Sequence, residues 1–164
     1  MTLRFGILTL SDRSARGERA DSSGPALARL IQAEGWSVTK QSILPDDESA
    51  IREILVTWAD SAELDVILTT GGTGFSPRDV TPEATRAVIE REAPGLSEAM
   101  RAASLKITPH AMLSRIVTGI RKKTLIINLP GSPKGAVENL QVVLSVLPHA
   151  VQLLQDNPAS ESTH

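Results

Sequence analysis

The sequence predicts an α/β protein of three layers, in which a mostly parallel β-sheet has helices on both faces and an antiparallel hairpin element. One observation behind this prediction is that apolar strand-like runs alternate with segments of helical periodicity, which is typical of consecutive βαβ units. Another is that only a very short turn separates the last two strand-like runs, so they must pair antiparallel. The length of 164 residues fits a single domain with its own core.

Each expected element is bounded by turn residues or by helix caps. In chain order, the elements are strand 3–10, loop 12–22, a helix from Ser23-Gly24-Pro25 to Gly35, strand 36–44, a helix after Pro45-Asp46-Asp47, strand 65–70, helices 82–91 and 94–105, strands 115–120 and 124–129, and a last helix from Ser132-Pro133.

The helices follow from apolar residues that recur on one face. The second helix, for example, has Ile51, Leu55 and Trp58 at such positions. Thr81 is expected to cap the third helix, with Pro82 as its first residue. Pro148 should kink or split the last helix, because proline removes a backbone donor inside a helix.

Composition narrows the function classes. The net charge is −2 with few aromatic residues, so nucleic acid is not an expected partner. Cysteine is absent, which excludes thiolate nucleophiles and cysteine zinc sites. No signal peptide is visible and no apolar stretch approaches the roughly 20 residues of a membrane span, so we expect a cytoplasmic protein without a membrane segment. Residues 1–156 are expected to form the single domain and 157–164 a disordered tail.

The most informative segment is the glycine-rich stretch between the third strand and the next helix. Glycine lets backbone amides approach a ligand closely, and a helix start favours an anion, so this loop suits a phosphate or carboxylate. It lacks the lysine of a Walker A loop and the third glycine of a dinucleotide fingerprint. A tight structural turn is the alternative. The small residues of the stretch run from Thr69 to Gly74, and Ser76 follows them.

Two carboxylates, Asp46 and Asp79, follow the second and third strands. The carboxyl ends of parallel strands meet at one edge of a sheet, so the loops there converge. Asp79 would repel an anion in the glycine loop unless a cation such as Mg²⁺ lay between them. The alternatives are a helix N-cap for Asp46 and a turn residue for Asp79.

A second strand-to-helix turn, Leu129-Pro130-Gly131-Ser132-Pro133, reaches the same edge. Ser132 with Pro133 fits the first positions of a helix, although a plain structural turn would look the same. Arg78 and Lys134 are candidate cations for a bound phosphate. The histidines are too far apart in sequence for a metal site, and no hydrolytic triad emerges.

These motifs together resemble the MogA/MoaB family of molybdenum-cofactor biosynthesis proteins, and more narrowly the MogA-type molybdopterin adenylyltransferases. The likeness runs from about residue 3 to residue 155. It rests on Ser11-Asp12, Pro45-Asp46, Thr69-Thr70-Gly71-Gly72-Thr73-Gly74, the run from Arg78 to Thr85, and the run from Asn128 to Lys134.

The resemblance implies a molybdopterin-binding fold, a homotrimer, and transfer of AMP from ATP to molybdopterin with Mg²⁺ and release of pyrophosphate. A partner protein would then insert molybdate. Asp46 and Asp79 would be the catalytic and metal-binding carboxylates. The implied substrate-binding residues are Ser11, Thr70, Gly71, Gly72, Thr73, Gly74, Ser76, Asn128, Pro130, Gly131 and Ser132.

Two other functions stay open. The chain could hold molybdopterin as a carrier or scaffold, as a MoaB-like protein without adenylylation. It could also be a pyrophosphatase or amidase built on the same domain, although no plausible nucleophile is visible.

Overall fold

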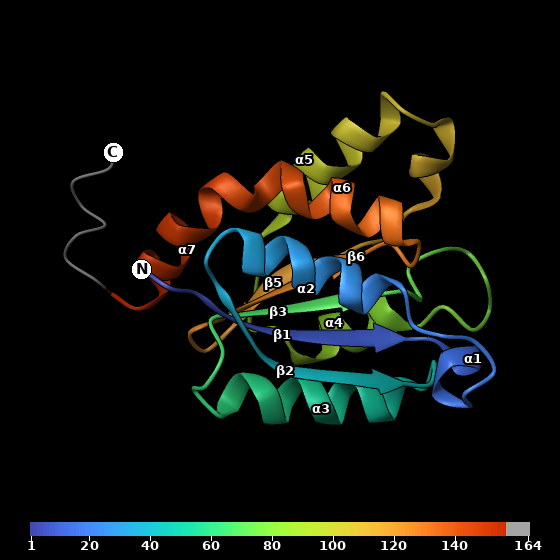
Figure 1. Ribbon diagram of the computed structural model, residues 1–164, viewed down its shortest axis with the longest axis horizontal. Coiled ribbons are helices and arrows are strands. Elements are labelled where there is room, and N and C mark those ends of the chain that lie inside the picture. The colour runs from blue at the N-terminus through green and yellow to red at the C-terminus, as the bar shows by residue number, and fades with distance from the viewer. Residues whose placement is uncertain (157–164) are drawn as a thin grey trace.

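A six-stranded sheet in the order β2-β1-β3-β6-β5-β4 forms the centre of the protein (Figure 1). The computed structural model describes residues 1–156, so the predicted tail 157–164 lies outside the described residues. The parallel strands are β1 (Arg4–Leu10), β2 (Ser37–Leu44), β3 (Val66–Thr70) and β6 (Thr124–Leu129). The antiparallel edge consists of β5 (Thr118–Arg121) and β4 (Arg91–Glu92). The predicted three-layer class with an antiparallel hairpin is therefore confirmed.

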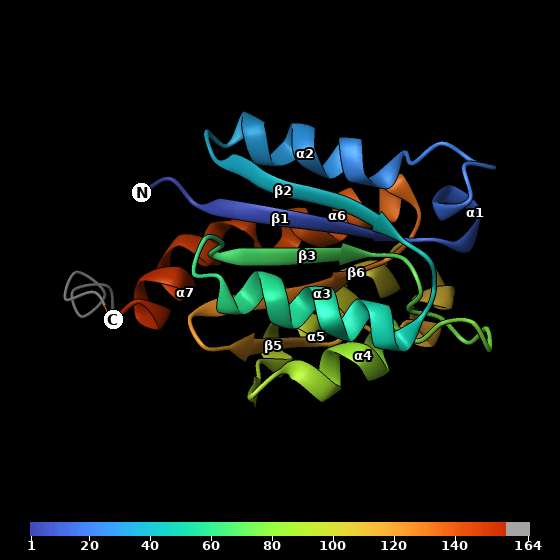
Figure 2. The same ribbon diagram turned by 90° about the horizontal axis from the view of Figure 1, so that it is seen from below.

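Helices cover both faces of this sheet, as Figure 2 shows from below. One face carries α3 (Glu48–Asp60) and α4 (Thr81–Val88). The other face carries α2 (Ser23–Ala33), α5 (Pro94–Leu105), α6 (Pro133–Val143) and α7 (Leu147–Leu154). The short helix α1 (Asp12–Ala15) and the 3₁₀ turns η1 (Pro109–Leu113) and η2 (Leu144–Val146) complete the described elements.

The strands divide their apolar side chains between two cores, because successive residues of a strand point to opposite faces. In β1, Phe5 and Ile7 are buried against the α2–α6 side, whereas Leu8 and Leu10 are buried against the α3–α4 side. Both faces of the central strands are thus covered, which leaves only the ends of the strands for polar function.

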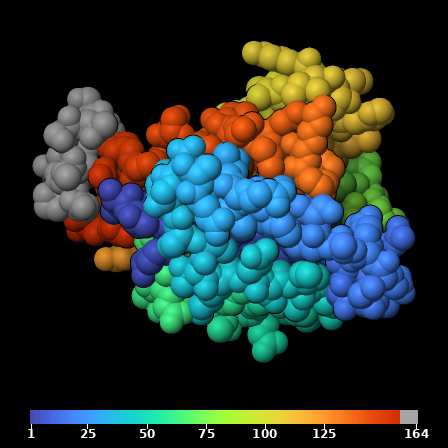
Figure 3. All heavy atoms as spheres, in the orientation of Figure 1, coloured from blue at the N-terminus to red at the C-terminus, as the bar shows by residue number. Residues whose placement is uncertain are grey.

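All four parallel strands end at the same edge of the sheet (Figure 1). Helix α1 and the loop over residues 71–80 lie at that edge, side by side although they are far apart in the sequence (Figure 3). The sheet therefore gathers at one place the loops that sequence analysis had marked as polar.

Several local predictions need correction. The expected loop 12–22 contains α1, and β5 begins at Thr118 instead of residue 115. Helix α4 begins at Thr81 with Val80 as its N-cap residue, so Thr81 is not the cap. Its hydroxyl instead donates to the Gly71 carbonyl (2.9 Å). The split of the last helix is confirmed, because η2 separates α6 from α7, whose first turn contains Pro148.

The segment Pro133–Leu154 also differs from the expectation that no apolar stretch approaches the length of a membrane span. Its 22 residues are long and apolar enough, by length and composition alone, to cross a membrane. In the structure, Leu140, Val143, Leu147 and Val151 of this segment are buried in the core on the sheet. A core-covering helix passes the same test, so the composition is weak evidence for a membrane span.

Candidate active site

A polar cavity of about 580 Å³ opens at the edge where the parallel strands end. The loops after β1, β2 and β3 and the first turns of α2 and α6 form its walls. Sequence analysis had named many of the lining residues: Ser11, Asp46, Thr70, Gly71, Gly72, Asp79, Gly131 and Ser132. The convergence expected from strand order is therefore present in the structure.

The glycine loop has a backbone that only glycine accommodates easily. Gly71 and Gly72 have φ angles of +106° and +67°. A Cβ at Gly71 would strike the Leu10 carbonyl, and one at Gly72 would lie against Thr81 and 2.9 Å from Oδ1 of Asp46. The loop can therefore pack directly against the neighbouring strand and against Asp46.

Not every amide of this loop is available to a ligand. The amide of Gly71 donates to the Leu129 carbonyl (3.2 Å), so it cannot also bind a phosphate. Within residues 1–156, the amides of Gly72, Thr73 and Gly74 donate no hydrogen bond. The predicted anion-binding groups are therefore narrowed to these three amides. Of the three residues, only Gly72 lines the polar cavity.

Arg115 binds the part of the loop that follows the glycines. Its guanidinium donates to the Gly74 carbonyl (2.8 Å) and the Asp79 carbonyl (2.9 Å) and pairs with Glu83 (2.8 Å). The pairing with Glu83 raises the pKa of Arg115, so the clamp stays charged. Sequence analysis missed this role because it assigned residue 115 to a strand, and no local pattern marks a contact 41 positions away.

Asp46 has one satisfied and one unsatisfied oxygen. Its Oδ2 accepts from the amide of Asp12 (3.1 Å), whereas its buried Oδ1 has no hydrogen-bond partner among the described residues. Burial raises the pKa of Asp46, and the nearby charges of Asp12 and Asp79 act in the same direction. The N-cap alternative for Asp46 is wrong, because Asp47 caps α3 by accepting from Ser49 (3.0 Å).

Asp79 closes its own turn and also lines the cavity. Its Oδ2 accepts from the amide of Ser76 (3.1 Å), and its amide donates to the Ser76 carbonyl (2.9 Å). The turn-residue interpretation of Asp79 is therefore correct, and it does not exclude a role toward a ligand. Ser76 itself lines neither this cavity nor the neighbouring one described below.

Asp46 and Asp79 offer oxygen donors of the kind that bind magnesium together with nucleotide phosphates. Among residues 1–156, no group of three or more metal-binding side chains comes together, so this part of the chain offers no closed metal cage. Mg²⁺ is commonly held by one or two carboxylates plus substrate phosphates. The unpartnered Oδ1 of Asp46 and the carboxylate of Asp79 match that donor set.

The turn before α6 contributes mainly backbone groups. Ser132 caps α6 as predicted, accepting from the amide of Gly135 (3.1 Å). The carbonyl of Pro130 accepts from Thr70 (2.7 Å), and that of Gly131 accepts from Ser23 (2.5 Å). These contacts fix the turn against the glycine loop and the start of α2.

Asn128 does not reach either cavity. It is fully buried and donates to the hydroxyls of Thr69 and Thr85 (2.9 Å each), while its Oδ1 accepts from the amide of Val117 (3.1 Å). All its polar atoms are thus used to hold β6 to β3, α4 and the segment before β5. The structure therefore does not bring this predicted binding residue to either cavity.

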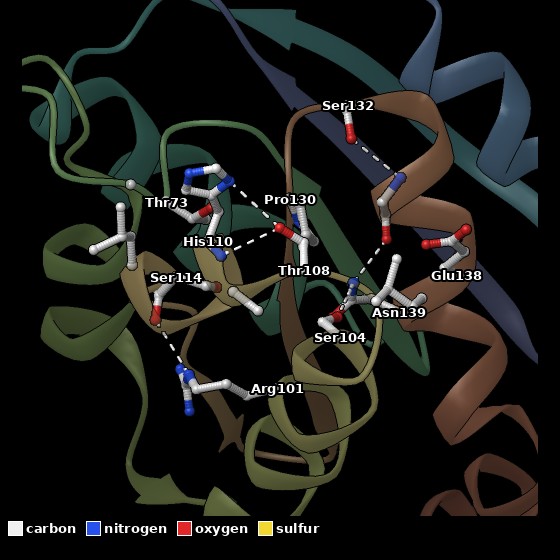
Figure 4. A pocket seen from close by; sticks show the side chains of 15 residues that line it. Thr73, Arg101, Ser104, Thr108, His110, Ser114, Pro130, Ser132, Glu138 and Asn139 are labelled. Atoms are coloured by element: carbon white, nitrogen blue, oxygen red, sulfur yellow. Dashed lines mark hydrogen bonds between the residues drawn. The ribbon is translucent and has the colours of Figure 1, made fainter.

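A second cavity of about 300 Å³, whose lining side chains are drawn in Figure 4, shares a lining residue with the first. Thr73, Gly74, Pro130 and Ser132 line it, and Ser132 also lines the polar cavity. Its opposite wall comes from α5, η1 and α6, and most of the area that lines the cavity is apolar. That wall also carries the charged Arg101 and Glu138 and polar groups such as Ser114, whose buried hydroxyl has no partner among the described residues. Sequence analysis missed this cavity because its walls come from distant segments.

The cations that sequence analysis considered are engaged elsewhere. Arg78 pairs with both oxygens of Asp12 (2.9 Å each), and Lys134 lies 3.9 Å from Glu138. Among the described residues, Arg19 is the basic side chain that lines the polar cavity, where its Nη2 lies 3.4 Å from the Ser11 hydroxyl. It sits in a loop, and nothing in its sequence context distinguishes it from a solvated arginine.

The chain is similar to known proteins of molybdenum-cofactor biosynthesis. Residues 6–149 match the family model described as a probable molybdopterin binding domain. The chain is 40% identical over 158 residues to the molybdopterin adenylyltransferase of Helicobacter pylori strain J99, and the match covers 95% of this chain and 90% of that protein. It is 48% identical to the molybdenum cofactor synthesis protein cinnamon of Drosophila melanogaster, covering 95% of this chain but only 26% of that longer protein.

The fold is also similar to a solved structure. The crystal structure of the molybdopterin biosynthesis enzyme MoaB from Thermus thermophilus superposes with a TM-score of 0.89 at 51% identity, covering 96% of this chain and 99% of that one.

Proposed function

Because this chain belongs to the molybdopterin-binding domain family of molybdenum-cofactor biosynthesis, we propose that it transfers the adenylyl group of ATP to the phosphate of molybdopterin. The observation that carries this proposal is the pair of carboxylates, Asp46 and Asp79, in a cavity beside free backbone amides. Carboxylates repel phosphates, so their place in an anion site is explained by a reaction that brings a cation with its substrate.

The reaction balances without a general base. An ionised oxygen of the molybdopterin phosphate forms a bond to the α-phosphorus of ATP, and the bond from that phosphorus to the β-phosphate oxygen breaks, releasing pyrophosphate. Catalysis then consists of holding two anions in line and stabilising the charge that develops. Mg²⁺ held by Asp46 and Asp79 would offset the repulsion between the phosphates.

The chain's own groups divide this work between them. The amides of Gly72, Thr73 and Gly74 are free to donate to a phosphate, and Arg19 adds a positive charge on the cavity wall. The ties from Thr81 and Arg115 keep the loop in place before any ligand arrives. Such preorganised donors need not reorganise during the reaction.

The two cavities differ in polarity in the way that a pterin ring and its phosphate differ. The smaller cavity presents mostly apolar area together with several polar side chains, a lining that suits a planar ring with hydrogen-bonding groups. Since both cavities meet at Ser132, a pterin in the smaller one can direct its phosphate into the polar one. We therefore assign the pterin to the smaller cavity and the ATP phosphates to the polar one.

The test is incubation of the purified protein with molybdopterin, Mg²⁺ and ATP labelled at the α-phosphate. Label in the pterin with release of pyrophosphate supports the proposal. Tight binding of molybdopterin without label would instead identify a carrier or scaffold. Label released as free AMP in the absence of molybdopterin would indicate a pyrophosphatase.

A homotrimer is also part of the proposal. Several large apolar side chains on and beside η1 and α6 are exposed, and a subunit interface would cover them. Light scattering on the purified protein measures the mass directly, and a monomer would contradict this assignment. The exposed residues are Leu105 (40%), Ile107 (62%), Met112 (68%), Leu113 (44%) and Val142 (39%).

The last parts of the proposal are a cytoplasmic location and a partner protein that receives adenylyl-molybdopterin and inserts molybdate. Addition of molybdate and a candidate partner to the completed reaction tests the second point. Consumption of the adenylylated pterin only when both are present would support it.

A further inference from the structure

We propose that Asp12 and Arg78 form a positioning pair, which orients the carboxylate of Asp46 and sets its place relative to Asp79. This inference rests on the proposed function, because it assigns the pair a role at the same metal–nucleotide site. Neither residue lines the polar cavity, so both would act through the carboxylates and not by touching the substrate.

Asp12 and Asp46 make a reciprocal contact. The amide of Asp12 donates to Oδ2 of Asp46 (3.1 Å), and the amide of Asp46 donates to Oδ1 of Asp12 (3.0 Å). Two hydrogen bonds in opposite directions fix both the backbone and the side chain of Asp46. Since Oδ2 is held in this way, Oδ1 is left beside Gly72 without a partner among the described residues.

Arg78 in turn binds the carboxylate of Asp12. Its Nε and Nη2 donate to the two oxygens of Asp12, each at 2.9 Å, which is the bidentate geometry that restrains a carboxylate most strongly. Arg78 directly precedes Asp79 in the glycine loop. The pair therefore joins three loops, which follow β1, β2 and β3, and holds the two metal-binding carboxylates in one arrangement.

Arg78 also balances charge at this place. Asp12 and Asp46 bring two carboxylates together, and the guanidinium that binds both oxygens of Asp12 offsets their mutual repulsion.

A role in overall stability is a poor explanation for the pair. The Arg78 side chain is 65% exposed and that of Asp12 is 23% exposed, and exposed ion pairs contribute little to folding. Arg86 and Glu92 form an ion pair of the same length (2.9 Å) with a similarly exposed arginine (59%). Neither Arg86 nor Glu92 lines the two cavities of the candidate site, so this pair is a control for the loss of an exposed arginine ion pair.

The experiment compares Arg78→Ala, Arg78→Lys and Asp12→Asn with Arg86→Ala. Metal binding is measured first, by electron paramagnetic resonance of Mn²⁺ titrated into protein with ATP and without molybdopterin. Mn²⁺ prefers the same oxygen ligands as Mg²⁺. We expect Arg78→Ala and Asp12→Asn to weaken Mn²⁺–ATP binding about tenfold, as loss of a group that orients a metal ligand does. Arg78→Lys should recover part of the loss, and Arg86→Ala should bind like the wild type.

Turnover provides the second readout. In Arg78→Ala, kcat should fall about tenfold while KM for molybdopterin stays unchanged, and the melting temperature should match that of Arg86→Ala. Wild-type Mn²⁺–ATP binding in Arg78→Ala would overturn the inference, as would equal losses in Arg78→Ala and Arg86→Ala. If the wild type binds Mn²⁺–ATP but forms no adenylylated pterin, the proposed function fails, while the metal-binding comparison still decides the role of the pair.

Discussion

Buried carboxylates at the two ends of the parallel sheet differ in how completely they are hydrogen-bonded. At the edge where the strands begin, Asp65 is buried and accepts four hydrogen bonds, three from Arg4 and one from Gln155. At the edge where they end, Asp46 keeps one buried oxygen without a partner in the described chain. Complete pairing is what a structural carboxylate requires, because an unsatisfied buried group costs free energy.

This difference shows which end of the sheet is arranged for stability and which for binding. Asp60, also at the first edge, pairs with Arg121 through two hydrogen bonds of 2.9 and 3.0 Å. Among residues 1–156, the cavity at the second edge has the free amide of Gly72, a carboxylate oxygen of Asp46 without a partner, and the exposed Arg19. Natural proteins tolerate such groups mainly where a ligand satisfies them.

The largest expected effect is the loss of adenylyl transfer in Asp46→Asn and Asp79→Asn. Each substitution removes a charge that would hold the metal ion, so we expect kcat to fall at least about 100-fold. The dissociation constant for molybdopterin, measured by fluorescence quenching, should change by less than about threefold, because the pterin is assigned to the other cavity. Lost pterin binding in a folded variant would show that the two cavities do not divide the substrates in this way.

The next effect concerns the opposite edge and should leave transfer intact. Asp65→Asn places an amide group among donors from Arg4 and Gln155, so about 2 kcal/mol of unfolding free energy should be lost. In a chain of this length that corresponds to a fall of about 6 °C in melting temperature. Adenylyl transfer per folded molecule should equal that of the wild type at low temperature, and a reduced kcat would remove the contrast between the two edges.

A smaller effect is expected from Arg19→Ala. Arg19 is the basic side chain among the described residues of the polar cavity wall, so its loss should raise KM for ATP about tenfold, equivalent to roughly 1.4 kcal/mol. The rise should shrink as salt is added, because exposed charges are screened. Arg13→Ala, on the same short segment but outside the cavity lining, is the control, and an equal effect there would contradict a specific contact.

The sequence predicts which loops lie at the ligand-binding edge of the sheet, because the strands and helices follow from local patterns in the chain. Alternating strands and helices indicate a parallel sheet, which brings Asp46 and Asp79 to one edge. Arg115, Arg19 and the smaller cavity could not be predicted, since each depends on which distant loops touch. Thr81 shows the same limit at a helix end, where its hydroxyl holds the Gly71 carbonyl instead of capping α4.

The smallest expected effect is on the melting temperature, which an aspartate-to-asparagine substitution should change in opposite directions at the two edges. Arg121 lowers the pKa of Asp60, so the ionised form stabilises the fold above the ordinary aspartate pKa and that contribution disappears as pH falls through the lowered value. Asp60→Asn should therefore reduce the melting temperature at pH 7, and the gap to the wild type should close in acid.

Asp46→Asn should act in the opposite direction. Burial raises the pKa of Asp46, which means that its charge opposes folding at neutral pH and ceases to do so as the group is protonated. Removing the charge should raise the melting temperature at pH 7 in protein free of nucleotide and divalent metal. A lower melting temperature in Asp46→Asn would mean that the charge is already compensated by the surrounding groups. In that case the unpartnered oxygen of Asp46 would not reduce the free energy of unfolding, and binding of a ligand would relieve nothing. The two edges would then differ only in their effect on catalysis.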